Sequence, residues 1–223
     1  MAMPLRSRIR DARAWRESQA REWTEFNYCV IDIETTGLDP GKDSIISFGA
    51  VPIIEGRISV PHGTSFLIRP ECAVGIESAK IHMLRDQDLR EMPRIGSYAP
   101  AIAAAVEGRI VVAHSAWMEQ NFLTHALGRR ELPFRLPIID TARMAEKALD
   151  LPPLGRADVS LEYLSQSLGL PTHTPHDALS DALTTAQVFL VLAHKLAAQQ
   201  PLVLRELLSL SQSTSTGVHY GWR

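Results

Sequence analysis

Two carboxylates, Asp32 and Glu34, stand one residue apart at the end of the nearly continuous apolar run 28–33. Such a run is typical of a strand that is buried on both faces of a sheet. Because side chains alternate along a strand, both carboxylates point to the same face. In poorly solvated surroundings each charge raises the pKa of the other unless a cation compensates, and hard divalent ions such as Mg²⁺ favour oxygen ligands. The pair indicates either a metal site or a hydrated, inert rim of the sheet, and its spacing favours neither.

Two more acidic residues lie where predicted elements begin or pack. Glu119 is in the first turn of a helix predicted over 119–127, which follows a short buried strand at 110–113. Asp181 lies in a long helix that can run to about Gln199. Read alone, each acid is typical of a solvated helix face. Their recurrence at the ends of elements is what indicates a common site, because sites in α/β sheets form at strand ends.

A histidine precedes Asp181 at the start of the long helix. The segment 174–177, Thr-Pro-His-Asp, carries helix-start signals: a capping Thr, Pro at the first helical position and an acid three residues after the Thr. On a regular helix His176 and Asp181 would lie about 140° apart, so they share a site only if His176 is in the loop or the frayed first turn. There it could take a proton from a metal-bound water, or it could be an ordinary exposed histidine. Ala178 and Ala182 are small enough to bring this helix close to the sheet.

The elements that position these residues predict an α/β fold. Apolar segments at 45–54, 57–60 and 65–68 follow the first strand with short connections, which favours an antiparallel meander. The rest of the chain alternates short strands with helices, which favours a mixed sheet with helices on both faces. We divide the chain into an N-terminal amphipathic helix at 1–25, a main domain at 26–200, and a last helix with a mobile tail at 201–223.

Composition excludes several classes of protein. The 223 residues are 45% hydrophobic and 22% charged, as in an ordinary globular protein, and are enough for one large domain. The formal net charge of -2 gives no global attraction to a polyanion, so nucleic-acid binding would need local basic patches or bound metal. Two cysteines give no disulfide framework, and no apolar run approaches the roughly eighteen residues of a membrane span. We therefore expect a cytoplasmic protein that does not associate with membranes.

Three segments resemble the motifs of a known enzyme family. Residues 32–37, Asp-Ile-Glu-Thr-Thr-Gly, resemble the first motif of the DnaQ-like 3′-to-5′ exonucleases, which include the proofreading subunit of bacterial DNA polymerase III, RNase T and oligoribonuclease. Residues 176–182 resemble the third motif, His-x-Ala-x-x-Asp-Ala, of the subclass with a catalytic histidine (DEDDh). Residues 81–83 resemble the segment Ile-His-Gly, with Met in place of Gly. The resemblance covers about residues 26–195, and the first and third motifs together make it specific.

The second motif departs from the family pattern. Family members typically read His-Asn-Ala-x-Phe-Asp-x-x-Phe, whereas residues 114–122 read His-Ser-Ala-Trp-Met-Glu-Gln-Asn-Phe. Glu119 therefore stands where the family has its third acidic residue. Glutamate keeps the charge and adds one carbon-carbon bond, about 1.5 Å of reach. We expect metal binding to survive this change, with an altered rate or metal preference.

The resemblance implies an RNase H-like mixed five-stranded sheet and an exonuclease domain at 26–200. It implies release of nucleoside monophosphates from single-stranded DNA or RNA 3′ ends. His176 would be the general base and two Mg²⁺ or Mn²⁺ ions, about 3.5 to 4 Å apart, the cofactors. The metal-binding residues would be Asp32, Glu34, Glu119 and Asp181. The substrate-binding residues would be Thr35, Thr36, Leu38, His82 and Phe122, with the first three acting through backbone amides and an apolar wedge.

Two other classes of function stay open on the sequence. One is a catalytically weakened, nuclease-like binding module, which rests on Glu119 alone. The other is a metal-free interaction protein, which would make four acids and a histidine in family order a coincidence. The site chemistry is common to DNA, RNA and short oligonucleotides, because it acts on sugar and phosphate. Association with a polymerase, self-association and the biological pathway leave no signature in the residues.

Overall fold

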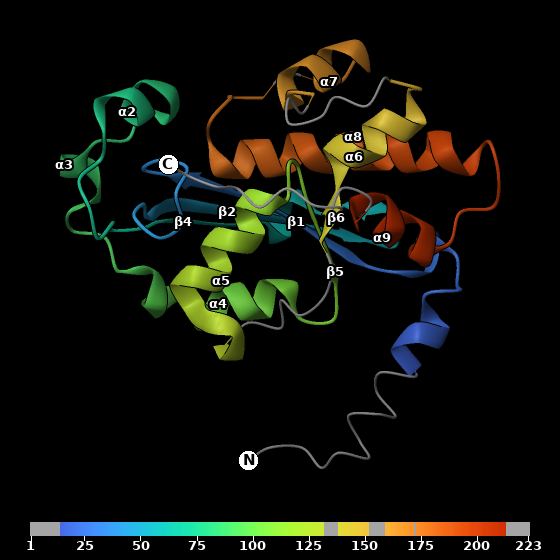
Figure 1. Cartoon of the computed structure of the whole chain (residues 1–223), viewed down its shortest axis with the longest axis horizontal. Helices are drawn as coiled ribbons and strands as arrows, with labels where there is room; N and C mark the ends of the chain where they lie inside the picture. The colour runs from blue at the N-terminus through green and yellow to red at the C-terminus, as the bar shows by residue number, and fades with distance from the viewer. Residues whose placement is uncertain (1–13, 132–137, 152–158, 172, 213–223) are drawn as a thin grey trace.

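The computed structural model describes residues 14–131, 138–151, 159–171 and 173–212. Its centre is a six-stranded mixed sheet in the order β3-β2-β1-β5-β6, with β4 also paired to β2 (Figure 1). The strands are β1 (Tyr28–Thr35), β2 (Ile45–Ile54), β3 (Arg57–Ile58), β4 (Thr64–Leu67), β5 (Ile110–Ala113) and β6 (Ile139–Asp140). The predicted α/β class and mixed sheet are confirmed, and the sixth strand arises because β3 and β4 both pair with β2.

The central strand β1 divides the core into two layers. It runs antiparallel to β2 and parallel to β5. Tyr28 and Val30 pack into the core beneath α8 (Ala178–Ala197), whereas Ile31 and Ile33 pack into the core beneath α4 (Ile95–Val106) and α5 (Trp117–Glu131). Alternation along the strand therefore directs Asp32 and Glu34 to the side of the sheet that α8 covers.

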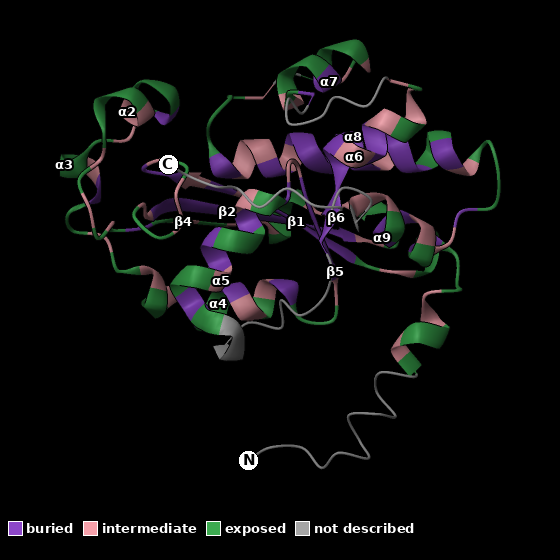
Figure 2. Cartoon of the chain, viewed as in Figure 1, coloured by how far each residue is buried: buried purple, intermediate pink, exposed green. Residues whose placement is uncertain are grey.

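The helices lie on both faces of the sheet. Helix α8, with α6 (Thr141–Ala148) and α7 (Leu161–Ser167), lies on one side, and α4 and α5 lie on the other (Figure 1). Helix α9 (Leu204–Gln212) packs beside α6 and β6. Strands β1, β2, β5 and β6 and helix α8 are largely buried, whereas the short helices α2 (Ile76–His82) and α3 (Asp86–Leu89) are largely exposed (Figure 2).

A glycine on β2 allows α8 to approach the sheet closely. A Cβ atom on Gly49 would lie 2.2 Å from the carbonyl oxygen of Ala178, the first residue of α8. Gly49 is also the register partner of Asp32. The predicted close packing through Ala178 and Ala182, both buried, therefore depends on a third small residue across the interface.

The N-terminal end of the chain differs from the prediction. Residues 14–18 are helical, but residues 19–22 are not, and η1 (Trp23–Glu25) is a separate 3₁₀ turn. The helix predicted over 1–25 is interrupted because Trp23 N–H donates to Leu202 O and Leu204 N–H donates to Arg21 O. Residues 1–13 lie outside the described part of the chain. At the other end, α9 (Leu204–Gln212) is the helix predicted within 201–223, and residues 213–223 lie outside the described part.

Both cysteines, Cys29 and Cys72, are free thiols. Among the described helices, none combines the length and the apolar character that crossing a membrane requires.

Candidate active site

Asp32 and Glu34 emerge together at the end of β1. Burial raises the pKa of Asp32 well above its usual range, and the charges of Glu119, Glu34 and Asp181 raise it further. Burial also raises the pKa of Glu34 to about 7, together with the charges of Asp181 and Asp177. The carboxylates therefore lie close enough to repel one another, and a cation among them would relieve that repulsion.

Glu119 reaches this cluster from α5. Its residue is only 3% exposed, and its Oε2 has no hydrogen-bond partner among the described residues. Burial raises the pKa of Glu119 to about 8, and the negative charges of Asp140 and Glu34 contribute to this increase. A hydrogen bond from the backbone N–H of Glu119 lowers the pKa and partly offsets it. A buried carboxylate oxygen without a partner is costly unless it binds a cation. Its presence beside other acids fits a divalent metal ligand.

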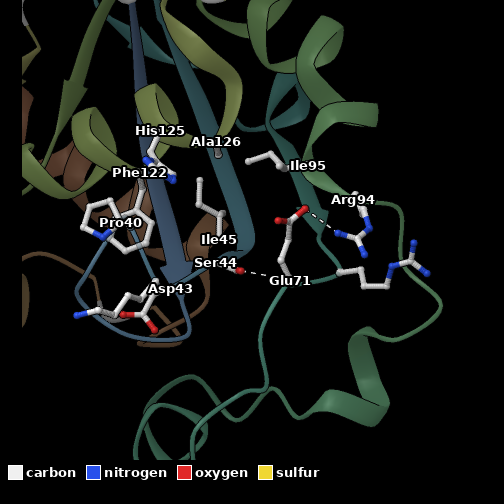
Figure 3. A pocket seen from close by; sticks show the side chains of 13 residues that line it. Pro40, Asp43, Ser44, Ile45, Glu71, Arg94, Ile95, Phe122, His125 and Ala126 are labelled. Atoms are coloured by element: carbon white, nitrogen blue, oxygen red, sulfur yellow. Dashed lines mark hydrogen bonds and ion pairs between the residues drawn. The ribbon is translucent and has the colours of Figure 1, made fainter.

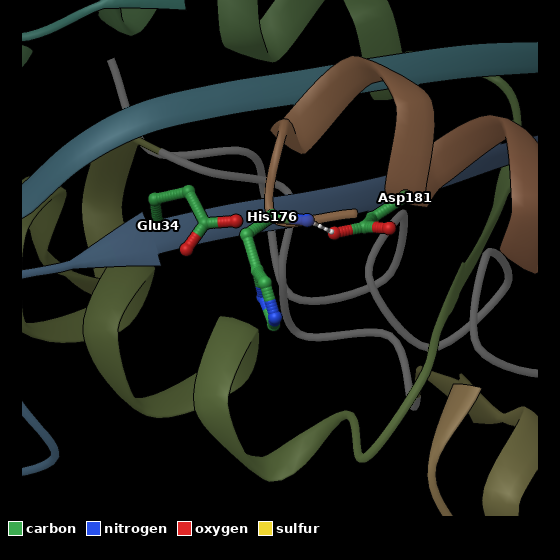
Figure 4. Close-up of side chains that lie close together, drawn as sticks. All are labelled: Glu34, His176 and Asp181. Carbon is green, nitrogen blue, oxygen red and sulfur yellow. Dashed lines mark hydrogen bonds between the residues drawn. The ribbon is translucent and has the colours of Figure 1, made fainter. Parts of the chain in front are cut away.

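Asp181 and His176 complete the cluster at the start of α8. His176 has a left-handed backbone, with φ of 58°, and precedes the helix. Its N–H donates to Asp181 Oδ2 at 2.7 Å (Figure 4). This conformation brings the two residues together although their sequence separation would place them on different sides of a helix. One possible ligand atom from each of Glu34, His176 and Asp181 lies within 4.8 Å of the others. Burial raises the pKa of Asp181, which the hydrogen bond from His176 partly offsets.

The loop after β1 presents Leu38 but uses the polar groups of its threonines internally. Thr35 Oγ1 donates to Gly37 O at 2.6 Å. Thr36 N–H donates to Ser44 O at 3.0 Å, and its hydroxyl donates to the Asp43 carboxylate. The Thr36 N–H is therefore already hydrogen-bonded within the protein, whereas the predicted role in substrate binding requires it to be available to the nucleotide. Leu38 is 61% exposed, as an apolar wedge requires.

The other two predicted substrate residues are buried. His82 Nδ1 accepts from Leu84 N–H at 3.1 Å, which leaves its buried Nε2 with no partner among the described residues. Burial lowers the pKa of His82, and so does the charge of His176, which places the two rings near one another. Phe122 is 2% exposed and packs in the core beneath α4 and α5, so the structure does not bring it to the surface.

A cavity of about 240 Å³ lies between the loop 40–45 and α5 (Figure 3). Phe122 and His125 line its α5 side. On the opposite side Arg94 Nη1 pairs with Glu71 Oε1 at 2.6 Å. The cavity is lined by none of the clustered acids, so it is separate from the candidate site.

Two residues near the site were not predicted from the sequence. Asp177 caps α8 by accepting from Ser180 N–H, and its charge acts on Asp32, Glu34 and Asp181. Asp140 caps α6, and its charge acts on Glu119. The cap of α8 is Asp177, three residues after Thr174, which the sequence predicts as the cap. The distance of Asp177 and Asp140 from the other acids was not readable from the sequence.

Comparison with known proteins assigns the family. The profile of the RNase T exonuclease family matches residues 29–189. The chain belongs to this exonuclease family. It is 30% identical over 199 residues to the DNA polymerase III subunit epsilon of Treponema pallidum, covering 85% of this chain and 90% of the relative. It is 35% identical over 164 residues to the PolC-type DNA polymerase III of Thermotoga petrophila, covering 73% of this chain but only 12% of that much longer protein.

Solved structures agree with the family. Exonuclease X in complex with 5′ overhanging duplex DNA matches with a TM-score of 0.63 and 22% identity, covering 82% of this chain and 99% of that one. The nuclease domain of 3′hExo, a DEDDh family member bound to rAMP, matches with a TM-score of 0.64 and 17% identity, covering 75% and 92%. At these identities the structures support the fold alone. The predicted DnaQ-like exonuclease family and the RNase H-like fold are confirmed, and this family depends on divalent metals.

Proposed function

We propose that this chain is a metal-dependent 3′-to-5′ exonuclease that releases nucleoside monophosphates from single-stranded ends. The observation that carries the proposal is the buried Glu119 carboxylate, whose Oε2 has no hydrogen-bond partner among the described residues and which lies beside three further acids whose charges act on one another. These acids come from β1, α5 and α8, so the fold itself assembles them. Family membership supplies the reaction class.

Four carboxylates would hold the metal, namely Asp32, Glu34, Glu119 and Asp181. Two Mg²⁺ or Mn²⁺ ions bound there would supply the positive charge that favours water deprotonation and departure of the 3′ oxygen. His176 is exposed, and a ring nitrogen would accept the proton of the attacking water. Its backbone bond to Asp181 holds it beside the acids while its ring stays accessible. Leu38 and His82 would contact the terminal nucleotide.

The names of the relatives favour DNA as the polymer and a polymerase as a partner, and we propose both for this chain. A cytoplasmic location stays a prediction. The test is a gel assay of 5′-labelled single-stranded DNA and RNA of the same sequence with Mg²⁺ or Mn²⁺. We expect a ladder of shortened products that His176→Ala and Asp32→Ala abolish. A ladder of unchanged intensity in both variants would reject the assigned residues.

A weakened binding module is the second candidate, because Glu119 replaces the aspartate of the family motif. Its longer side chain is fully enclosed, so the extra methylene must be accommodated inside the site. Glu119→Asp separates the two functions. A large rise in the rate of nucleotide release favours the weakened module, whereas an unchanged or lower rate favours an enzyme adapted to glutamate.

A further inference from the structure

Asp140 connects the end of β6 to the start of a distant helix. Asp140 is 8% exposed, and its carboxylate accepts hydrogen bonds from three backbone N–H groups. Oδ1 accepts from Ser115 at 3.1 Å and from Ala142 at 2.9 Å, and Oδ2 accepts from Ala116 at 3.1 Å. One side chain therefore caps its own helix α6 and also fixes the turn from which α5 begins.

That turn determines where Glu119 is placed. The first N–H groups of a helix have no partner within the helix and need an acceptor from elsewhere. Ser115 is in the left-handed region with φ of 54°, so the chain turns sharply there. Met118 N–H then donates to Ser115 O, and Gln120 N–H donates to Ala116 O. Glu119 lies in the chain between the two donors, Met118 and Gln120, so a movement of the turn at Ser115 and Ala116 would also move the Glu119 backbone.

We propose that Asp140 is a positioning residue that holds the first turn of α5 so that the Glu119 carboxylate reaches the metal site. The inference rests on the proposed function in assigning Glu119 to metal. It adds a residue outside all three motifs that supports the position at which this chain departs from its family. The role proposed for Asp140 is support and not metal binding, since both of its oxygens accept backbone hydrogen bonds.

The test measures Mn²⁺ affinity by calorimetry on the whole chain, with no nucleic acid and no turnover. We expect Asp140→Asn to weaken Mn²⁺ binding about tenfold, in the range for residues that orient metal ligands. Asp140→Ser keeps a cap for α6 but has one oxygen in place of two, and should weaken binding as well. Ser160→Ala is the matched control, since Ser160 caps α7 by accepting from Tyr163 N–H at 3.1 Å. It should lower the thermal midpoint and leave Mn²⁺ affinity unchanged.

The same measurement in a Glu119→Ala background tests whether Asp140 affects Mn²⁺ binding through Glu119. In that background Asp140→Asn should change Mn²⁺ affinity less than twofold, because the Glu119 carboxylate that Asp140 positions has been removed. An equal loss in both backgrounds, or a lower thermal midpoint with unaltered Mn²⁺ affinity, overturns the inference. Failure of the nuclease assay alone would reject the proposed function and leave this result standing, because Mn²⁺ binding is measured without substrate.

Discussion

Glu34→Gln should stabilise the metal-free protein at high pH. Burial and the charges of Asp181 and Asp177 raise the pKa of Glu34 from 4.5 to about 7. The folded state therefore binds the Glu34 proton more tightly than the unfolded chain does. The resulting stability is present below about pH 4.5 and is lost as the pH rises to about 7. In the metal-free protein above that pH, the ionised side chain opposes folding.

The expected gain follows from the two pKa values. At about 1.4 kcal/mol per pKa unit the difference corresponds to about 3 kcal/mol, and partial exposure of Glu34 reduces it to about 2 kcal/mol. Urea unfolding in EDTA should show Glu34→Gln to be more stable than the wild type by that amount at pH 8, and about equally stable at pH 4. Adding Mn²⁺ at pH 8 should favour the wild type, because in the proposed site the ion binds the folded state through the Glu34 carboxylate.

A surface variant controls for charge alone. Glu77→Gln removes a carboxylate whose side chain is 85% exposed, so it should change the free energy of unfolding by less than about 0.5 kcal/mol at either pH. The reasoning is refuted if Glu34→Gln gives no gain at pH 8 in EDTA, or the same gain at both pH values.

Three further variants test the site and its support. His176→Ala should lower the single-turnover rate constant about 10²- to 10⁴-fold, because it removes the proposed general base, and a loss below about tenfold would exclude that role. Gly49→Ala should lower the free energy of unfolding in urea by about 1 to 3 kcal/mol and reduce activity, because the new methyl group would meet the Ala178 carbonyl. The control is Gly96→Ala, whose methyl group would meet nothing within 4 Å and should not destabilise the protein. Leu38→Ala should raise KM for oligonucleotides, measured by initial rates, with little change in the thermal midpoint, since the side chain is largely exposed. An unaltered KM would remove Leu38 from the substrate site.

Local rules were enough to predict the parts of the site that depend on one element. Strand alternation placed Asp32 and Glu34 on one face, and helix-start signals located His176 at the beginning of the long helix, although they began that helix at Pro175 and the structure begins it at Ala178. The family motifs then ordered the acids. Each of these inferences uses residues within a few positions of one another, where backbone geometry fixes which side chains share a face.

Features set by contacts between distant segments were not predictable in this way. The carboxylate of Asp140 meets Ser115 and Ala116 only because β5 and β6 pair in parallel. The interruption after residue 18 depends on backbone bonds to residues 202–204. The buried position of Phe122 depends on packing against the core beneath α4 and α5. Periodicity along the chain carries no information about such pairings.

The placement of Asp181 on α8 has a consequence for synthesis. Asp181 follows Glu119 by 62 residues, so at about 5 to 20 residues per second it is translated about 3 to 12 s later. Until then the nascent chain has neither the fourth carboxylate nor the histidine. Because α8 also packs on both β1 and β2, the same helix that would complete the proposed ligand set closes the core. A ribosome-bound fragment that ends before α8 should therefore lack the proposed nuclease activity, which would begin only when nearly the whole domain has been made.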